Sequence, residues 1–203
     1  MATPWVPQPG HRRAARRGVV VDDLAAIARQ LVERGVTTPE RITVHGGSAG
    51  GLLAGEMLTL HPELIGAAVA EVPLMDMRRY THLLAGAFWR TEFGDPDDPA
   101  DWALMEPLSP FHALRAGRDY PPLLLLTSTA DDRVHPAHAR TMAYRMEAMG
   151  LDVSYVEMTE GGHTGSAGGA APEQELDLEP AVAGEIAEGA LDGITLVYAG
   201  NGG

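Results

Sequence analysis

Hydrophobic positions recur at two different periods along the chain, and the change of period separates expected helices from expected strands. Apolar residues follow a helical spacing from Asp22, and Gly35 suits the end of that helix. Residues 41–45 form a short run that is typical of a strand. A glycine-rich turn follows, and a second helix is predicted through about Leu60, where a His-Pro pair ends it.

The middle of the chain continues this alternation. Residues 67–72 and 153–158 predict strands, and residues 137–149 predict a helix that ends at a glycine. Residues 122–128 carry a continuous apolar run, which is typical of a strand covered on both faces of a sheet. Residues 74–120 form a long insertion of mixed character. Strands that alternate with helices predict an α/β protein with a mostly parallel sheet flanked by helices.

The two ends of the chain differ from the region between them. Residues 1–17 combine prolines with a cluster of arginines, so we expect an irregular, basic N-terminus. Residues 18–165 hold the alternating pattern and form the expected folded region. Residues 166–203 are acidic and rich in glycine and alanine, and we expect a mobile tail over 166–193. Within the tail, the apolar run at 194–198 is the one candidate strand.

Charge and cysteine content exclude several classes of function. The chain has a net charge of −13 and 5% aromatic residues, which argues against nucleic acid or an anionic membrane as a partner. It has no cysteine, so a disulfide, a zinc–thiolate site and a thiol nucleophile are excluded. The pair Arg16-Arg17 lacks the apolar stretch of an export signal, and no run is long enough to span a membrane. We therefore expect a cytoplasmic protein.

Two histidines, His135 and His138, have a spacing that invites a metal-site interpretation. Further ligands do not lie near them in the sequence, so we interpret the pair as the opening of the helix at 137–149. We expect neither a metal nor a cofactor.

A glycine-rich turn with a central serine, Gly46-x-Ser48-x-Gly50, lies between an expected strand and an expected helix. This is the context of a nucleophile elbow, in which small neighbours allow a tight turn to lift a serine hydroxyl above the sheet. The amide of Ala49, at the start of the following helix, can donate a hydrogen bond to an oxyanion. The turn could instead bind phosphate, but the chain has no lysine and no Gly-x-Gly-x-x-Gly match.

A serine nucleophile needs a base and an orienting acid, and candidates for both follow expected strands. Asp131 and Asp132 follow the apolar strand, and His163 follows the strand at 153–158. The order serine, acid, histidine is that of α/β hydrolases. Either aspartate could instead cap a helix, and a lone histidine in a glycine loop could be a surface residue. Three candidates in this order and context favour the catalytic interpretation.

Six short segments add a specific combination of motifs: Gly46-Gly-Ser-Ala-Gly-Gly-Leu-Leu53, Val72-Pro-Leu-Met-Asp76, Phe88-Trp-Arg-Thr-Glu-Phe-Gly94, Ser109-Pro-Phe-His112, Asp131-Asp-Arg-Val-His-Pro136 and Gly161-Gly-His163. Together they resemble the prolyl oligopeptidase family of serine peptidases, from about Val20 to about Gly165. The resemblance implies a catalytic region with an α/β-hydrolase fold. It also implies cleavage of short peptides after proline, through an acyl-enzyme formed on Ser48.

The resemblance also implies roles for individual residues. It makes Asp131, rather than Asp132, the acid of the triad, and it makes Arg133 a ligand of a substrate backbone carbonyl. It places Trp89 against the substrate proline, although the residues alone favour core packing for this tryptophan. Ala49 stands where the family usually has asparagine, so a side chain is lost but the amide donor remains.

Family members carry an upstream β-propeller, the first strands of the hydrolase sheet, and a tyrosine that donates the second oxyanion hydrogen bond. Residues 1–40 contain no tyrosine and predict a helix, so we expect a truncated hydrolase sheet with a bare edge. The family's last helix is not apparent after Gly165. We expect a poor or inactive peptidase when the chain is alone. The alternatives are an esterase-type hydrolase, or an inactive remnant or half that needs a partner chain such as the propeller segment.

Overall fold

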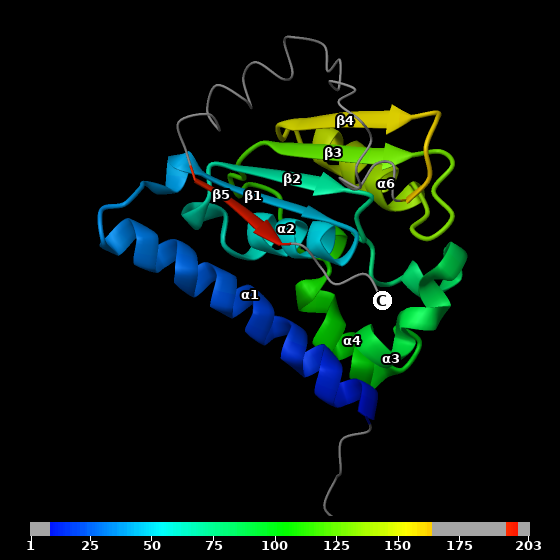
Figure 1. Ribbon diagram of the computed structural model, residues 1–203. Helices are drawn as coiled ribbons and strands as arrows, with labels where there is room; N and C mark the ends of the chain where they lie inside the picture. The colour runs from blue at the N-terminus through cyan, green and yellow to red at the C-terminus, as the bar shows by residue number, and fades with distance from the viewer. Residues whose placement is uncertain (1–8, 164–193, 199–203) are drawn as a thin grey trace, which may run out of the picture.

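The computed structural model of the chain describes residues 9–163 and 194–198, and these residues build one parallel sheet with helices against it (Figure 1). The strand order is β4-β3-β2-β1-β5, and every neighbouring pair is parallel. The strands are β1 (Ile42–Gly47), β2 (Ala67–Glu71), β3 (Leu123–Ser128), β4 (Val153–Met158) and β5 (Ile194–Tyr198). The predicted parallel α/β architecture is therefore confirmed.

Three long helices cover the sheet, and short helical segments fill the insertion between β2 and β3. The long helices are α1 (Pro9–Glu33), α2 (Ala49–Leu60) and α6 (Ala137–Ala148). The short α-helices are α3 (Arg90–Phe93), α4 (Pro99–Met105) and α5 (Pro110–Ala113). The 3-10 turns are η1 (Pro39–Arg41), η2 (Pro62–Leu64), η3 (Tyr80–His82), η4 (Leu84–Trp89) and η5 (Glu106–Leu108).

The main core lies between one face of the sheet and the three long helices. Alternate strand residues such as Val44 and Leu125 join residues of α1, α2 and α6 in one buried cluster. The period of two in the strands and the apolar faces of the helices meet there, as the hydrophobic pattern predicts. Strand β3 is buried along its whole length, in agreement with its continuous apolar sequence.

A second, smaller core joins the start of α2 to the insertion. Its buried members are Leu52, Leu74, Met77, Tyr80, Phe93, Met105 and Val134. The rings of Tyr80 and Phe93 meet edge to face with centroids 5.9 Å apart, and the Tyr80 hydroxyl donates to the carbonyl of Gly94. The insertion is therefore packed against the elbow helix rather than standing apart from the sheet.

Helix α1 begins at Pro9, so the expected irregular N-terminus is wrong for residues 9–17. Proline is tolerated in the first turn, where its missing N–H would have no helical partner. Alanine and arginine, which dominate this stretch, are strong helix formers. Because the stretch has almost no large apolar residues, no hydrophobic period marked it as helical.

Strand β5 lies beside β1, with Ile194 opposite Ile42. The candidate strand at 194–198 is confirmed, and it covers one edge of β1. Among the described strands, β5 and β4 are therefore the outer strands of the sheet. Leu196 of β5 is partly buried and packs against the main core. The prediction of a mobile segment over 166–193 lies outside the described residues.

Candidate active site

The turn between β1 and α2 holds Ser48 in a conformation that serine rarely adopts. Its φ is 55° and its ψ is −116°. Such backbone geometry costs about 1–3 kcal/mol and persists only where the surroundings enforce it. Two contacts do so here: the Ser48 N–H donates to the carbonyl of Glu71 on β2 at 2.8 Å, and the Leu52 N–H donates to the Ser48 carbonyl at 3.1 Å. The turn has the strained form of a nucleophile elbow.

Two glycines of the turn are required by close approach of backbone. A side chain at Gly46 would collide with the carbonyl of Gly50, one turn further on. A side chain at Gly51 would lie 2.7 Å from Cβ of Pro73, which follows β2. The predicted need for small residues around Ser48 is therefore explained by contacts both within the elbow and with the neighbouring strand.

Asp131 and His163 form a buried pair at the ends of two adjacent strands. Asp131 follows β3 and His163 follows β4, and their residues are 4% and 6% exposed. His163 Nδ1 lies 2.9 Å from Oδ2 and 3.0 Å from Oδ1 of Asp131. Asp132 is exposed. The structure thus brings together His163 and the first of the two candidate acids.

The surroundings of Asp131 keep its carboxyl ionised. Burial acts to raise its pKa, but hydrogen bonds from His163 and from the amides of Arg133 and Val134 outweigh this effect, so the pKa lies below its ordinary value. Both amides donate to Oδ1 at 2.9 Å. Because an ionised carboxylate only accepts hydrogen bonds, the proton of the His163 ring lies on Nδ1. Nε2 is then left with its lone pair, as a general base requires.

Two contacts join the loops that carry the pair. The Ser128 hydroxyl donates to the carbonyl of Gly161, and the Thr129 N–H donates to the carbonyl of Met158 at 2.9 Å. Gly161 has a φ of 85°, which favours glycine at this turn. The loop after β4 is therefore held against the loop after β3, with His163 facing Asp131.

Ser48, Asp131 and His163 all lie beyond the carboxyl ends of parallel strands, where α/β proteins place their sites. One strand, β2, lies between β1, which leads to Ser48, and β3, which leads to Asp131. Within the part of the chain that the structure describes, no hydrogen bond joins Ser48 to His163. Hydrogen bonds of this kind are often long in proteins without a ligand and shorten when substrate binds.

The second core connects the elbow to the residues expected to bind substrate. Ala49 and Trp89 are partly buried and pack against the same cluster, which also contains Val134. Arg133 is exposed, and its carbonyl accepts a hydrogen bond from the Ala85 N–H at 3.3 Å. Trp89 is therefore partly buried against this core, in agreement with the packing that the residues alone favour.

Two charged pairs close to the elbow were not predicted from the sequence. Arg17 on α1 lies with Nε 3.2 Å from Oε1 of Glu56 on α2, and its Nη2 donates to the carbonyl of Ala49 at 2.9 Å. His45 Nε2 lies 2.6 Å from Oε1 of Glu71, and this hydrogen bond raises the pKa of His45. Glu56 is the one charged residue within the apolar helix at 49–60, and this isolated charge was the feature of the sequence that could have indicated a buried ion pair.

The described residues contain no group of three or more side chains that could hold a metal ion. His138 is instead a buried structural residue whose Nδ1 accepts from the amides of Asp76 at 3.1 Å and Met75 at 3.3 Å. No described helix is both long and apolar enough to cross a membrane.

Known proteins match the chain over most of its length. The profile of the prolyl oligopeptidase family matches residues 12–180. An uncharacterized peptidase of Sinorhizobium fredii is 46% identical over 148 residues, which cover 73% of this chain and 20% of that protein. The prolyl endopeptidase of Elizabethkingia meningoseptica is 35% identical over 130 residues, which cover 64% of this chain and 18% of that protein.

Solved structures agree with this relationship. A post-proline cleaving enzyme from Rickettsia typhi has a TM-score of 0.72 at 36% identity, over 73% of this chain and 22% of that one. The chain thus spans about a fifth of the length of these relatives. The matched region confirms the α/β-hydrolase fold. From the family profile, the sequence relatives and the shared fold, the chain belongs to the prolyl oligopeptidase family.

Proposed function

We propose that the chain carries the catalytic centre of a serine peptidase, with Ser48 as nucleophile, His163 as base and Asp131 as the orienting acid. The buried hydrogen bond between His163 and Asp131 carries the proposal. It fixes the proton on Nδ1 and leaves Nε2 free at the end of the sheet that also bears the elbow. An ionised aspartate on a histidine, at the same end of the sheet as a strained serine, is the combination of groups that acyl transfer uses.

The reaction follows from these positions. Nε2 of His163 takes the proton of the Ser48 hydroxyl as Oγ attacks the carbonyl carbon of a peptide bond. The Ala49 amide, at the N-terminus of α2, donates to the oxyanion that forms. His163 then gives its proton to the leaving amine, which departs from an acyl-enzyme. A water molecule, deprotonated by the same nitrogen, then attacks the acyl carbon. The bond to Oγ breaks, the acid leaves, and His163 returns the proton to Oγ of Ser48.

For the substrate, we propose a short peptide cleaved after proline. Relatives named prolyl endopeptidase and post-proline cleaving enzyme support this choice. Trp89 packs against the same core as Ala49 of the elbow, and Arg133, two residues after Asp131, is exposed. Trp89 would stack on the proline, and Arg133 would bind a substrate carbonyl.

We expect the chain alone to be a weak peptidase. Ala49 is the one oxyanion donor that we assign, and loss of a second donor typically lowers turnover by about 10²–10³. The relatives are about five times longer, so their remaining parts could contribute to substrate binding. This can be measured with a chromogenic glycyl-prolyl amide, using the chain alone and the chain fused to the upstream segment of a full-length relative. Turnover of roughly 1–10³ per second by the chain alone would contradict the expectation.

The assignment of Ser48 can be tested independently of turnover. A fluorophosphonate probe should label the purified chain, and Ser48→Ala should abolish the labelling. Ser154→Ala, on β4, is the matched control and should label normally. Labelling that persists in Ser48→Ala would refute the assignment. Absence of labelling in the unaltered chain would favour an inactive remnant, or a half that needs a partner chain.

Esterase activity on the same triad is the second candidate. The single assigned oxyanion donor favours it, because an activated ester needs less stabilisation of its transition state than an amide does. Hydrolysis of a p-nitrophenyl ester without hydrolysis of a prolyl amide would support this alternative. Comparable rates on both substrates would support the peptidase.

A further inference from the structure

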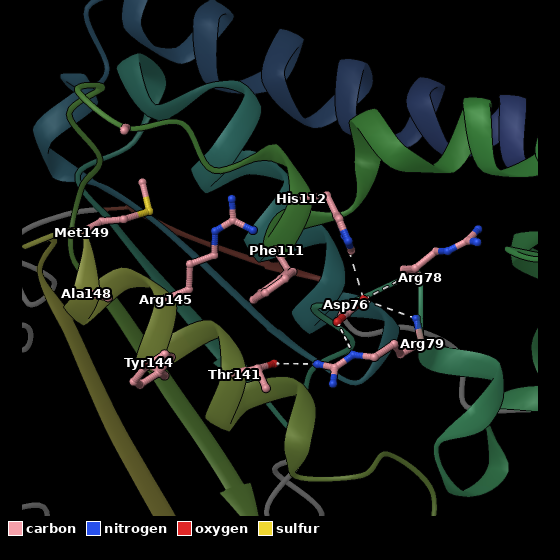
Figure 2. A pocket seen from close by; sticks show the side chains of 11 residues that line it. Asp76, Arg78, Arg79, Phe111, His112, Thr141, Tyr144, Arg145, Ala148 and Met149 are labelled. Atoms are coloured by element: carbon pink, nitrogen blue, oxygen red, sulfur yellow. Dashed lines mark hydrogen bonds and ion pairs between the residues drawn. The ribbon is translucent and has the colours of Figure 1, made fainter.

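A cavity of about 700 Å³ lies between α5, α6 and the segment after β2, and neither Ser48, Asp131 nor His163 lines it (Figure 2). Figure 2 shows the side chains of Phe111 and Arg145 converging in its centre. The cavity is a separate site, and nothing in the proposed peptidase chemistry makes use of it.

Arg145 is the chemically distinctive side chain of the cavity. Its guanidinium lies over the ring of Phe111, with Cζ 4.6 Å from the ring centroid. Among the described residues, no carboxylate lies within ion-pairing distance of it. This is notable in a chain with 28 acidic and 15 basic residues. A guanidinium that stacks on a ring keeps the N–H groups on its edges available for a planar, bidentate acceptor.

The other charged side chains of the cavity are engaged by groups of the protein. The Arg78 guanidinium donates to the carbonyl of Pro96 and lies 5.1 Å from the centroid of the Trp102 ring. Arg79 Nε donates to Oδ2 of Asp76 at 2.6 Å, and its Nη2 contacts Oγ1 of Thr141 on α6 at 3.4 Å. Asp76 Oδ1 also accepts from the amides of Arg78 and Arg79. Asp76 therefore cannot attract a cation into the cavity, and the positive charge of Arg145 is left uncompensated.

The remaining groups of the cavity are apolar or uncharged. Ala148 and Met149, near the C-terminal end of α6, form an apolar wall beside Arg145, and Phe111 forms the opposite side (Figure 2). Burial lowers the pKa of His112, which keeps its ring neutral at pH 7. A ligand would thus meet the uncompensated charge of Arg145 next to apolar surface.

We propose that this cavity binds an amphipathic monocarboxylate, with its carboxylate on Arg145 and its apolar body against Phe111, Ala148 and Met149. A cation is disfavoured by the charge of Arg145. A phosphate dianion would leave oxygens facing the apolar wall without donors, at a high desolvation cost. A carboxylate satisfies the guanidinium with two hydrogen bonds and leaves the apolar surface for the rest of the ligand.

Isothermal titration with 3-phenylpropionate tests the proposal on the full chain, and we expect saturable binding with a Kd of about 1 mM. 3-Phenylpropionamide, its neutral isostere, should bind at least tenfold more weakly. Arg145→Gln should weaken binding of the acid at least tenfold, and Arg145→Lys should weaken it less. Arg34→Gln, which removes an exposed charge at the end of α1, is the matched control and should leave binding unchanged.

Additional measurements separate a defect in the cavity from a defect in folding or in the triad. Circular dichroism should show that each variant keeps its fold, and methyl signals of Met149 should shift on binding. Ser48→Ala should bind the acid normally, so this site can fail or succeed regardless of the proposed function. N-acetyl-glycyl-phenylalanine and its amide distinguish a peptide terminus from a free acid as the source of the carboxylate. Equal binding of acid and amide, unchanged binding by Arg145→Gln, or no saturable binding of either carboxylate would overturn the proposal.

Discussion

Replacing Glu56 by glutamine should flatten the dependence of stability on pH between about 4.5 and 7. Glu56 is fully buried in α2, and burial raises the pKa of its carboxyl from 4.5 to about 7, although Arg17 partly opposes this. The folded state therefore binds a proton more tightly than the unfolded state does. The stabilising contribution of this proton is complete below pH 4.5 and is lost as the pH rises through 7.

The size of the effect follows from the difference between the two pKa values. Each pKa unit corresponds to about 1.4 kcal/mol, so a rise of the Glu56 pKa from 4.5 to about 7 corresponds to about 3 kcal/mol. Glutamine has the shape of the protonated carboxyl and does not titrate. We expect Glu56→Gln to gain up to about 3 kcal/mol of unfolding free energy over the unaltered chain between pH 4.5 and pH 8.

Urea unfolding, followed by tryptophan fluorescence at pH 5, 6, 7 and 8, measures this difference. The comparison of variant with parent removes the contributions of other titrating groups, such as His138 and Asp131. Glu147→Gln, an exposed glutamate on α6, is the control and should change the profile little. A difference that does not vary with pH, or a parent that gains on the variant as the pH rises, would refute the argument. Either result would mean that the pair with Arg17 keeps Glu56 charged.

Other residues of the site allow further predictions. Asp131→Asn should slow fluorophosphonate labelling far more than Asp132→Asn, because only Asp131 is buried against the base; the opposite ranking in a labelling time course would contradict the assignment. Ser48→Gly should raise the temperature midpoint of unfolding, because glycine adopts a φ of 55° without strain. Gly46→Ala should lower the midpoint, because the new Cβ would collide with Gly50. Shifts of the same sign in thermal melts would contradict this reasoning. Burial lowers the pKa of His138 to about 4, so its contribution to stability is complete above pH 6.5 and is lost as the pH falls toward 4. His138→Gln should therefore lose less stability on acidification than the parent, and equal losses would show that His138 is not the group responsible.

The parts of the fold that sequence predicts best are those with a strong local pattern. The leucines of β3 and the alternating residues of β4 identify strands without any knowledge of their partners. The elbow is local only in part, because the collision at Gly46 involves Gly50, whereas the collision at Gly51 involves Pro73 after β2. The choice of Asp131 over Asp132 was different. The position of the two aspartates along the chain did not decide between them. The family resemblance favoured Asp131, and its burial and contact with His163 agree with that choice.

The parts that sequence did not predict depend on contacts between distant segments. Residues 9–17 become helical although they lack an apolar period, and Arg17 then contacts a glutamate on α2. Neither partner indicates the other in the sequence, because 39 positions separate them. The cavity around Arg145 has the same origin: its lining comes from α5, α6 and the segment after β2. Propensity and period are local quantities, so features of this kind appear only when packing is known.

Strand β5 depends both on a local sequence pattern and on a contact between distant segments. The strand itself was visible as a short apolar run, but its place beside β1 was not. Its pairing has a consequence for the elbow, because β1 leads directly into Ser48. On one side, the carbonyl of Glu71 on β2 holds the Ser48 amide at 2.8 Å, and on the other side β5 pairs with β1 as far as Gly46. A strand with a free edge would expose unpaired amides and carbonyls and could twist away from the sheet. With both edges of β1 paired, the backbone that enters the elbow is fixed, and the strain at Ser48 is balanced by pairing on both sides.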